Sequence, residues 1–173
     1  LNDVMASGLP SRAIFGLHTH PNVVRIRAPY RPGALRTPEE NLALFNLAIS
    51  VMNSISANRY APDLVIGPRA ILNELSIQRV GASSDLSTLK YLNLNSSIKG
   101  YVPTSETETA SRSGGAILHF LLRDEDTEGL VTKAMTQLSM PQYRNGEYQV
   151  YWDAAVSGVH LDRPVKHVIL ELP

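Results

Sequence analysis

The longest regular hydrophobic pattern of the chain lies in residues 37–62, TPEENLALFNLAISVMNSISANRYAP. Apolar side chains recur there every three or four residues and leave only a narrow polar stripe, which is typical of a helix buried over most of its circumference. Thr37 and Glu40 form a capping box, and Pro38 occupies the first helical position. We therefore expect a long core helix from about Thr37 to Ala57.

Two-residue alternation and short apolar runs predict strands in other parts of the chain. Residues 23–28 alternate between apolar and arginine side chains, so Arg25 and Arg27 are expected on one face of a strand. The run AILHFLLRD (116–124) is almost entirely apolar, which is typical of a central strand covered on both faces. The stretch VKHVILELP (165–173) predicts a final strand.

Further local signals lie between these strands. The segment from Asp126 to Leu138 carries apolar residues at helical spacing after a polar, acidic start, and this pattern predicts a helix. The dipeptide Asn-Gly in RNGE (144–147) predicts a tight hairpin turn. From Thr104 to Gly115 the only apolar residue is Ala110, so we expect a flexible loop or linker at about residues 103–115.

The order of these elements favours an α+β fold. We expect residues 1–173 to form a single compact domain in which a mixed or antiparallel sheet packs on the long buried helix. Most of the sheet is expected to come from the better-patterned C-terminal third of the chain. A chain of 173 residues is long enough to bury about two-thirds of the surface that it exposes when unfolded.

Composition narrows the chemistry that the protein can perform. The chain has no cysteine, so disulfides, thiolate nucleophiles and cysteine-ligated metal sites are excluded. No apolar stretch approaches the ~20 residues that span a bilayer, so no transmembrane segment is expected. The N-terminal stretch lacks the pattern of a signal peptide, and because it starts at Leu1 instead of methionine we expect a processed or trimmed chain. No cofactor is predicted.

Charge is balanced overall but unevenly distributed. Charged residues make up 18% of the chain, with 16 basic and 16 acidic side chains, and this low share favours a surface partly covered by neighbouring molecules. Residues 1–36 contain five arginines and one aspartate, whereas residues 106–128 contain six acidic residues and two arginines. Such a two-signed distribution would orient head-to-tail contacts between copies of the chain.

The arginine set near the N-terminus is the most informative polar feature. Its members are predicted to bind anions or a partner: Arg25, Arg27, Tyr30, Arg31 and Arg36. The tyrosine could stack on a base or a guanidinium plane, so a nucleic acid strand or an anionic membrane surface would fit the set. The alternative is a solvated strand face whose arginines pair with acidic residues of a neighbouring copy. The zero net charge argues against strong general affinity for nucleic acid.

The six residues GLHTHP (16–21) contain two closely spaced histidines. On a strand, His18 and His20 would point to the same face and could ligate one metal ion. The motif resembles the His-x-His strand of metal-dependent amidohydrolases and the His-x-His-Pro element of JAMM-type metalloproteases. The JAMM pattern continues with Ser-x-x-Asp, whereas this chain continues with APYRP, and amidohydrolases need a (β/α)₈ barrel of about 250 residues. The alternative is a polar strand end.

The chain shows none of the common catalytic motifs. It lacks a G-x-S-x-G elbow, a G-x-G-x-x-G loop and a Walker phosphate loop. We therefore expect a non-enzymatic structural or interaction protein that self-associates into homo-oligomers, with a viral matrix or coat-associated component as its concrete form. Two alternatives stay open, namely a metal-dependent hydrolase that uses His18 and His20, and an RNA- or phosphate-binding module that uses the N-terminal arginines.

Overall fold

The computed structural model of the protein describes residues 8–9, 14–81, 84–123, 130–132, 136–137, 142–144, 147–149, 152–153, 156–159 and 163–173. The chain divides into two compact units. The ribbon unit comprises Leu1–His20 and Glu128–His160, and the sheet unit comprises Pro21–Thr127 and Leu161–Pro173. The expectation of a single domain stays a prediction.

The sheet unit is built on a five-stranded sheet with the strand order β3-β13-β6-β4-β5. Its strands are β3 Val24–Arg27, β4 Leu64–Pro68, β5 Gly100–Thr104, β6 Ile117–Leu121 and β13 His167–Glu171. The sheet is mixed, because β3 and β13 pair in parallel, as do β4 and β5, while β6 runs antiparallel to both β13 and β4. The strands predicted at residues 23–28, 116–124 and 165–173 are therefore confirmed.

The expectation that most of this sheet comes from the C-terminal third is wrong. Only β6 and β13 lie in that third, and the other three strands come from earlier parts of the chain. Two of these, β3 and β5, form the sheet edges and are short, with four and five residues. Short strands give a weak local pattern, and pairing such as that between Arg25 and Ile169 joins residues far apart in the sequence.

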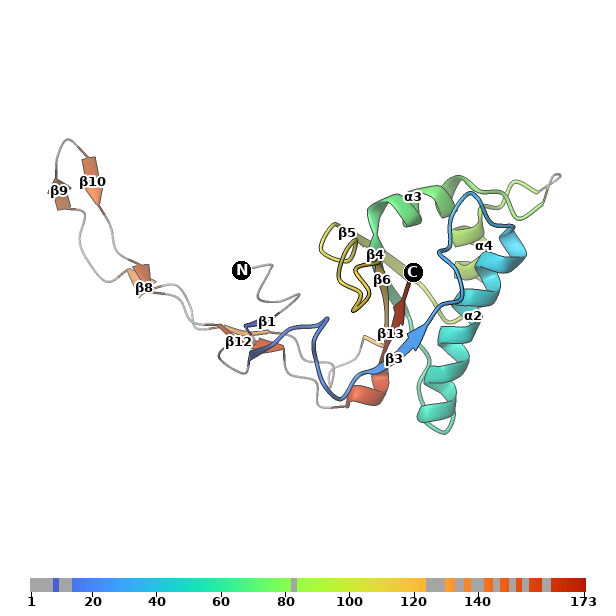
Figure 1. Cartoon of the computed structure of the whole chain (residues 1–173), viewed down its shortest axis with the longest axis horizontal. Helices are drawn as coiled ribbons and strands as arrows, with labels where there is room; N and C mark the ends of the chain where they lie inside the picture. The colour runs from blue at the N-terminus through green and yellow to red at the C-terminus, as the bar shows by residue number, and fades with distance from the viewer. Residues whose placement is uncertain are drawn as a thin grey trace. The chain divides into compact units, whose positions relative to one another are not determined.

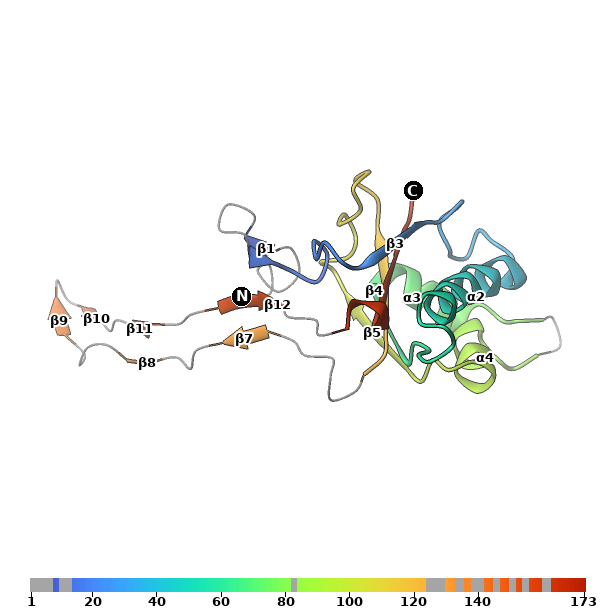
Figure 2. The same ribbon diagram turned by 90° about the horizontal axis from the view of Figure 1, so that it is seen from below.

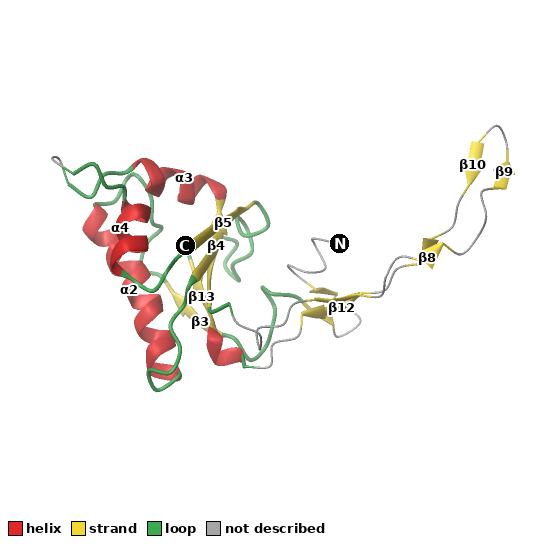
Figure 3. Ribbon diagram, turned by 180° about the vertical axis from the view of Figure 1, so that it is seen from behind, coloured by secondary structure: helices red, strands yellow, loops and turns green. Residues whose placement is uncertain are grey.

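Three α-helices of the sheet unit lie on one face of the sheet, as Figures 1 and 3 show. They are α2 Pro38–Ile55, α3 Arg69–Ile77 and α4 Thr88–Asn95, and a single 3₁₀ turn, η2 Pro164–Lys166, leads into β13. This arrangement is the α+β fold that the sequence favoured, with a mixed sheet packed on a long helix. In the described part of the chain, no helix is both long enough and apolar enough to cross a bilayer.

Helix α2 begins with the predicted capping box. The Glu40 amide donates to Oγ1 of Thr37 at 3.2 Å, and the Thr37 amide donates to the Glu40 carboxylate at 2.9 Å. The exposed stripe of the helix is wider than the pattern predicted, because Ala43 and Leu47 are exposed as well as Asn46, Ser50 and Ser54. The buried residues of the helix are Asn41, Leu44, Phe45, Ala48 and Met52.

The core lies between these helices and the sheet. Phe45 of α2 and Phe120 of β6 meet edge to face with their ring centroids 5.5 Å apart, a favourable geometry for aromatic pairs. Val168 and Leu170 of β13 belong to the same cluster, as alternation along a strand requires. All residues of β6 and β13 are buried, so both faces of these central strands are covered, as predicted for residues 116–124.

Residues 105–116 connect β5 to β6 through hydrogen-bonded turns. Thr107 is fully buried, and its carbonyl accepts a hydrogen bond from the Ile117 amide at 2.9 Å. The Ser111 amide donates to the Gly115 carbonyl at 2.9 Å. In Figures 1 and 2 this segment lies on the opposite side of the sheet from α2. The flexibility expected for residues 103–115 stays a prediction.

The described strands of the ribbon unit form antiparallel pairs. The pairs are β1 Gly8–Leu9 with β2 Ile14–Phe15, β7 Leu130–Thr132 with β12 Val156–Val159, β8 Thr136–Gln137 with β11 Trp152–Asp153, and β9 Gln142–Arg144 with β10 Glu147–Gln149. The last three are nested around residues 145–146, as in a long hairpin (Figure 2). Arg144 pairs with Glu147, as a two-residue connection requires, while the predicted Asn-Gly turn itself lies outside the described residues.

The helix predicted from Asp126 to Leu138 is wrong where the structure describes it, because residues 130–132 and 136–137 are strands. The β-branched residues Val131 and Thr132 favour extended backbone, and strand pairing supplies the hydrogen bonds that a helix would have formed within itself. The other residues of the predicted helix lie outside the described residues.

Candidate interaction surface

Arg25 of β3 is held inside the sheet unit by an ion pair. Its Nη1 atom lies 2.7 Å from Oε1 of Glu171 on β13, and the two side chains are only 14% and 7% exposed. Because a charge removed from water needs a partner, this pair ties the edge strand β3 to its neighbour. Arg25 thus pairs with an acidic residue of its own chain and presents little of its guanidinium to a ligand.

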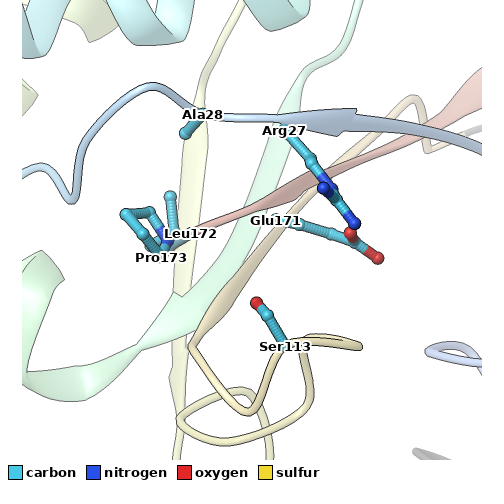
Figure 4. Close-up of a pocket in the computed structure, with 6 residues that line it drawn as sticks. All are labelled: Arg27, Ala28, Ser113, Glu171, Leu172 and Pro173. Carbon is cyan, nitrogen blue, oxygen red and sulfur yellow. The ribbon is translucent and has the colours of Figure 1, made fainter.

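Arg27 lies beside a pocket of about 410 Å³ (Figure 4). The lining residues are Arg27, Ala28, Ser113, Glu171, Leu172 and Pro173. Gly115 allows the segment that carries Ser113 to approach this wall, because a Cβ atom at Gly115 would lie 2.2 Å from the Leu172 carbonyl oxygen. The Ser113 hydroxyl lies 2.9 Å from the Ser111 hydroxyl, and the carboxylate that lines the pocket, Glu171, is paired with Arg25.

Residues 29–36, which we call the arginine loop, follow β3 and carry Tyr30, Arg31 and Arg36. The Arg36 guanidinium lies 4.7 Å from the centroid of the Tyr30 ring, so the stacking predicted for this tyrosine occurs within the set itself. The Arg36 guanidinium also lies 3.7 Å from the carboxylate of Glu40. The backbone carbonyl of Glu40 accepts a hydrogen bond from the Tyr30 hydroxyl at 3.0 Å. Arg31 is exposed and belongs to none of the ion pairs of the described residues.

The arginine loop is fixed by the buried side chain of Asn41. Its Oδ1 atom accepts from the Gly33 amide at 3.1 Å, while its Nδ2 group donates to the Gly33 carbonyl at 3.0 Å and to Oε1 of Gln78 at 2.7 Å. The Gln78 side chain in turn donates to the Arg36 carbonyl at 2.6 Å. Asn41 of α2 and Gln78, which caps the C-terminus of α3, therefore hold the loop backbone at Gly33 and Arg36 through one polar network.

The fixed loop presents a fully exposed leucine. Leu35 has a relative exposure of 101%, and the preceding residue, Ala34, donates its amide to the Glu74 carboxylate at 2.9 Å. An exposed apolar side chain on a fixed backbone is typical of a contact site, because little conformational entropy is lost when a partner covers it. Sequence reasoning missed Leu35 because it lies in no periodic pattern, although Asn41 on the apolar face of α2 was an available signal.

A second exposed surface of mixed character is formed by residues 102–108, which we call the acidic turn. Val102 on the edge strand β5 is 43% exposed, and the following residue, Pro103, is also exposed. Glu106 accepts a hydrogen bond from the Thr104 hydroxyl, which fixes the start of the turn, and Glu108 is exposed. The acidic turn thus combines an apolar edge with two carboxylates.

The geometry expected for the two histidines of GLHTHP is wrong. Residues 17–19 form a turn in which the Thr19 amide donates to the Gly16 carbonyl at 3.2 Å and the Gly16 amide donates to Oγ1 of Thr19 at 3.0 Å. This turn replaces the strand that would have aligned both imidazoles on one face. His18 is buried, whereas His20 is half-buried.

Two other histidines are in direct contact inside the sheet unit. Nδ1 of His119 on β6 and Nε2 of His167 on β13 are 2.8 Å apart. The N–H group of one imidazole therefore donates a hydrogen bond to the unprotonated nitrogen of the other. The pairing depends on the register of β6 against β13, which no local pattern encodes. Within the described ranges, no three side chains of His, Cys, Asp or Glu gather to form a metal site.

Comparison with known proteins identifies the fold. No protein family and no curated protein sequence matches the chain. Among solved structures, the capsid of Myoviridae phage XM1 is similar with a TM-score of 0.75 and 16% identity over 99% of this chain and 60% of that chain. The virus-like particle from Pyrococcus furiosus is similar with a TM-score of 0.64 and 14% identity over 98% of this chain and 62% of that chain.

These similarities show a common fold. The chain spans about three fifths of the length of the two proteins that it resembles, and nearly all of the chain takes part in each superposition. The protein therefore has an α+β fold that is also found in a phage capsid protein and in the protein of a virus-like particle.

Proposed function

We propose that the protein is a self-associating structural protein that builds a shell or a coat-like assembly. The observation that carries this proposal is the extent of the fold similarity, since 99% of the chain superposes on a phage capsid protein with a TM-score of 0.75. A virus-like particle protein with the same fold gives independent support. Fold alone does not determine function, so the surface of this chain has to be consistent with assembly.

The surface of the sheet unit supports the same proposal. Leu35 is exposed on a loop that a buried polar network fixes, and Val102 is exposed on an edge strand. Basic and acidic residues are concentrated in different parts of the sequence, which favours contacts between unlike surfaces of neighbouring copies. An exposed leucine on a fixed loop is available for contact with a neighbouring copy at a small cost in conformational entropy.

Light scattering of the purified full chain tests the proposal. We expect the mean mass to rise with protein concentration above the 19.0 kDa of one chain, and negative-stain electron microscopy of the largest species to show regular assemblies. Added salt should shift the distribution towards smaller species, because it screens contacts between exposed charges. A mass that stays at that of one chain at every concentration and salt level would contradict the proposal.

A further inference from the structure

The arginine loop and the acidic turn are complementary in charge. Residues 29–36 carry Arg31 and Arg36 and no acidic residue, while residues 102–108 carry Glu106 and Glu108 and no basic residue. Because Glu40 pairs with Arg36 and the Glu74 carboxylate lies against the Ala34 amide, Arg31 is the charge that the loop offers to a partner. Arg31 and Glu108 are exposed, and neither belongs to an ion pair of the described residues. Opposite charges on two surfaces of one chain favour contact between two copies and set its orientation.

Arginines that strand pairing or sequence brings towards the acidic turn form no ion pair with it in the described part of the chain. Arg69 follows β4, which pairs with β5, and Arg112 lies later in the same connection to β6. The ion pairs of the described residues are Arg25–Glu171, Arg36–Glu40 and Arg123–Asp63, so none of them includes Arg69, Arg112 or a glutamate of the acidic turn.

The same two surfaces also match in their apolar parts. Leu35 stands between Arg31 and Arg36 in the loop sequence, and Val102 with Pro103 lies a few residues before the two glutamates of the turn. An apolar centre with charged residues around it is the usual anatomy of a protein interface. Covering a leucine contributes more to a contact than an exposed ion pair does.

We infer that the arginine loop of one copy docks on the acidic turn of a second copy, with Leu35 against Val102 and Pro103, and Arg31 near Glu108. This inference rests on the proposed function, because it names the contact through which copies associate. The loop is held by α2 and α3, whereas the turn continues from the edge strand β5, so the contact joins two different surfaces. Such a head-to-tail contact repeats from copy to copy and builds rings or larger assemblies.

Disulfide trapping between two single variants tests the contact directly, because the natural chain has no cysteine. We expect a mixture of Leu35→Cys and Val102→Cys chains to form a covalent dimer under mild oxidation, since a disulfide requires Cα atoms within about 7 Å. A mixture of Leu94→Cys and Val102→Cys is the control, because Leu94 on α4 is also exposed, at 62%. Equal yields of dimer in the two mixtures would overturn the inference.

Charge reversal gives a second, independent test. Arg31→Glu should weaken self-association about tenfold, and the double variant Arg31→Glu with Glu108→Arg should restore it, because the pair then carries exchanged charges. Both side chains are exposed, so we expect each variant to unfold at the denaturant concentration of the natural chain. Loss of association in both single variants without recovery in the double variant would contradict the pairing.

The experiments separate the inference from the proposed function. If the natural chain assembles but neither the trapping nor the charge reversal shows the expected result, the docking contact is wrong and the proposed function stands. If the natural chain is monomeric at every concentration, both are wrong.

Discussion

Asn41 is the residue on which the shape of the arginine loop depends. It is a fully buried polar side chain on the apolar face of α2, and each of its side-chain polar atoms has a partner. Such a buried polar side chain stabilises the fold only while all its hydrogen bonds are formed. A buried donor or acceptor without a partner has lost its hydrogen bonds to water and gains none from the protein.

Replacing Asn41 should therefore be costly. We expect Asn41→Ala to lower the free energy of unfolding by about 2 kcal/mol or more, because the Gly33 backbone groups lose their buried partner and a small cavity forms. Urea unfolding measures this change. Asn46→Ala on the same helix is the matched control, since Asn46 is exposed, and its effect should be small. Similar losses for the two variants would contradict the role of the network.

Ionisation of Tyr101 on β5 should make the free energy of unfolding depend on pH. Burial raises the pKa of its hydroxyl well above the ordinary value of 10, and the hydroxyl donates to the Leu89 carbonyl at 3.2 Å. Below that ordinary value the tyrosine is neutral in both the folded and the unfolded chain. Above it, the tyrosine ionises first in the unfolded chain, so the free energy of unfolding falls as the pH rises.

The free energy of unfolding should therefore fall between pH 10 and pH 11 for this one group, and solvent screening of the partly exposed side chain reduces the size of the fall. Tyr101→Phe removes the ionisable hydroxyl and should make the free energy of unfolding less dependent on pH in this range. Chemical denaturation of both proteins at a series of alkaline pH values measures the difference. Parallel pH profiles for the two proteins would contradict the assignment.

At the scale of elements, the edge strand β3 depends on its ion pair with β13. Arg25→Met should lower the free energy of unfolding by about 3 kcal/mol, because it leaves the largely buried Glu171 carboxylate without its cation. The double variant Arg25→Met with Glu171→Leu should recover much of this loss, since no charge then remains buried. Equal stability of the single and the double variant in denaturant unfolding would argue against the pair.

Local signals predicted those elements whose ends and faces are encoded within a few residues. The capping box at Thr37 and Glu40 placed the start of α2, and the apolar run at residues 116–124 placed β6 as a central strand. The segment at residues 130–137 was assigned wrongly, because its apolar spacing fits a helix while its partners on β11 and β12 favour a strand. Pairing partners are distant in the sequence, so local spacing does not reveal them.

At the scale of the whole molecule, the sequence shows where charged residues are concentrated but not which of them the fold covers. The excess of arginine before residue 37 and the acidic residues after residue 105 are visible in the sequence. The ion pair of Arg25 with Glu171 depends on strand pairing, and the fixing of Leu35 depends on contacts between α2, α3 and the loop. These tertiary contacts decide which arginines are covered by the fold and which remain exposed.

We predict that the protein works as an assembly of identical copies. Sedimentation velocity of the full chain over a wide range of concentration is the most direct test, with Leu35→Asp as the companion variant. We expect the natural chain to form larger species as its concentration rises, and the variant to need about ten times more protein to reach the same average size. A natural chain that sediments as a single 19.0 kDa species at every concentration would contradict the account.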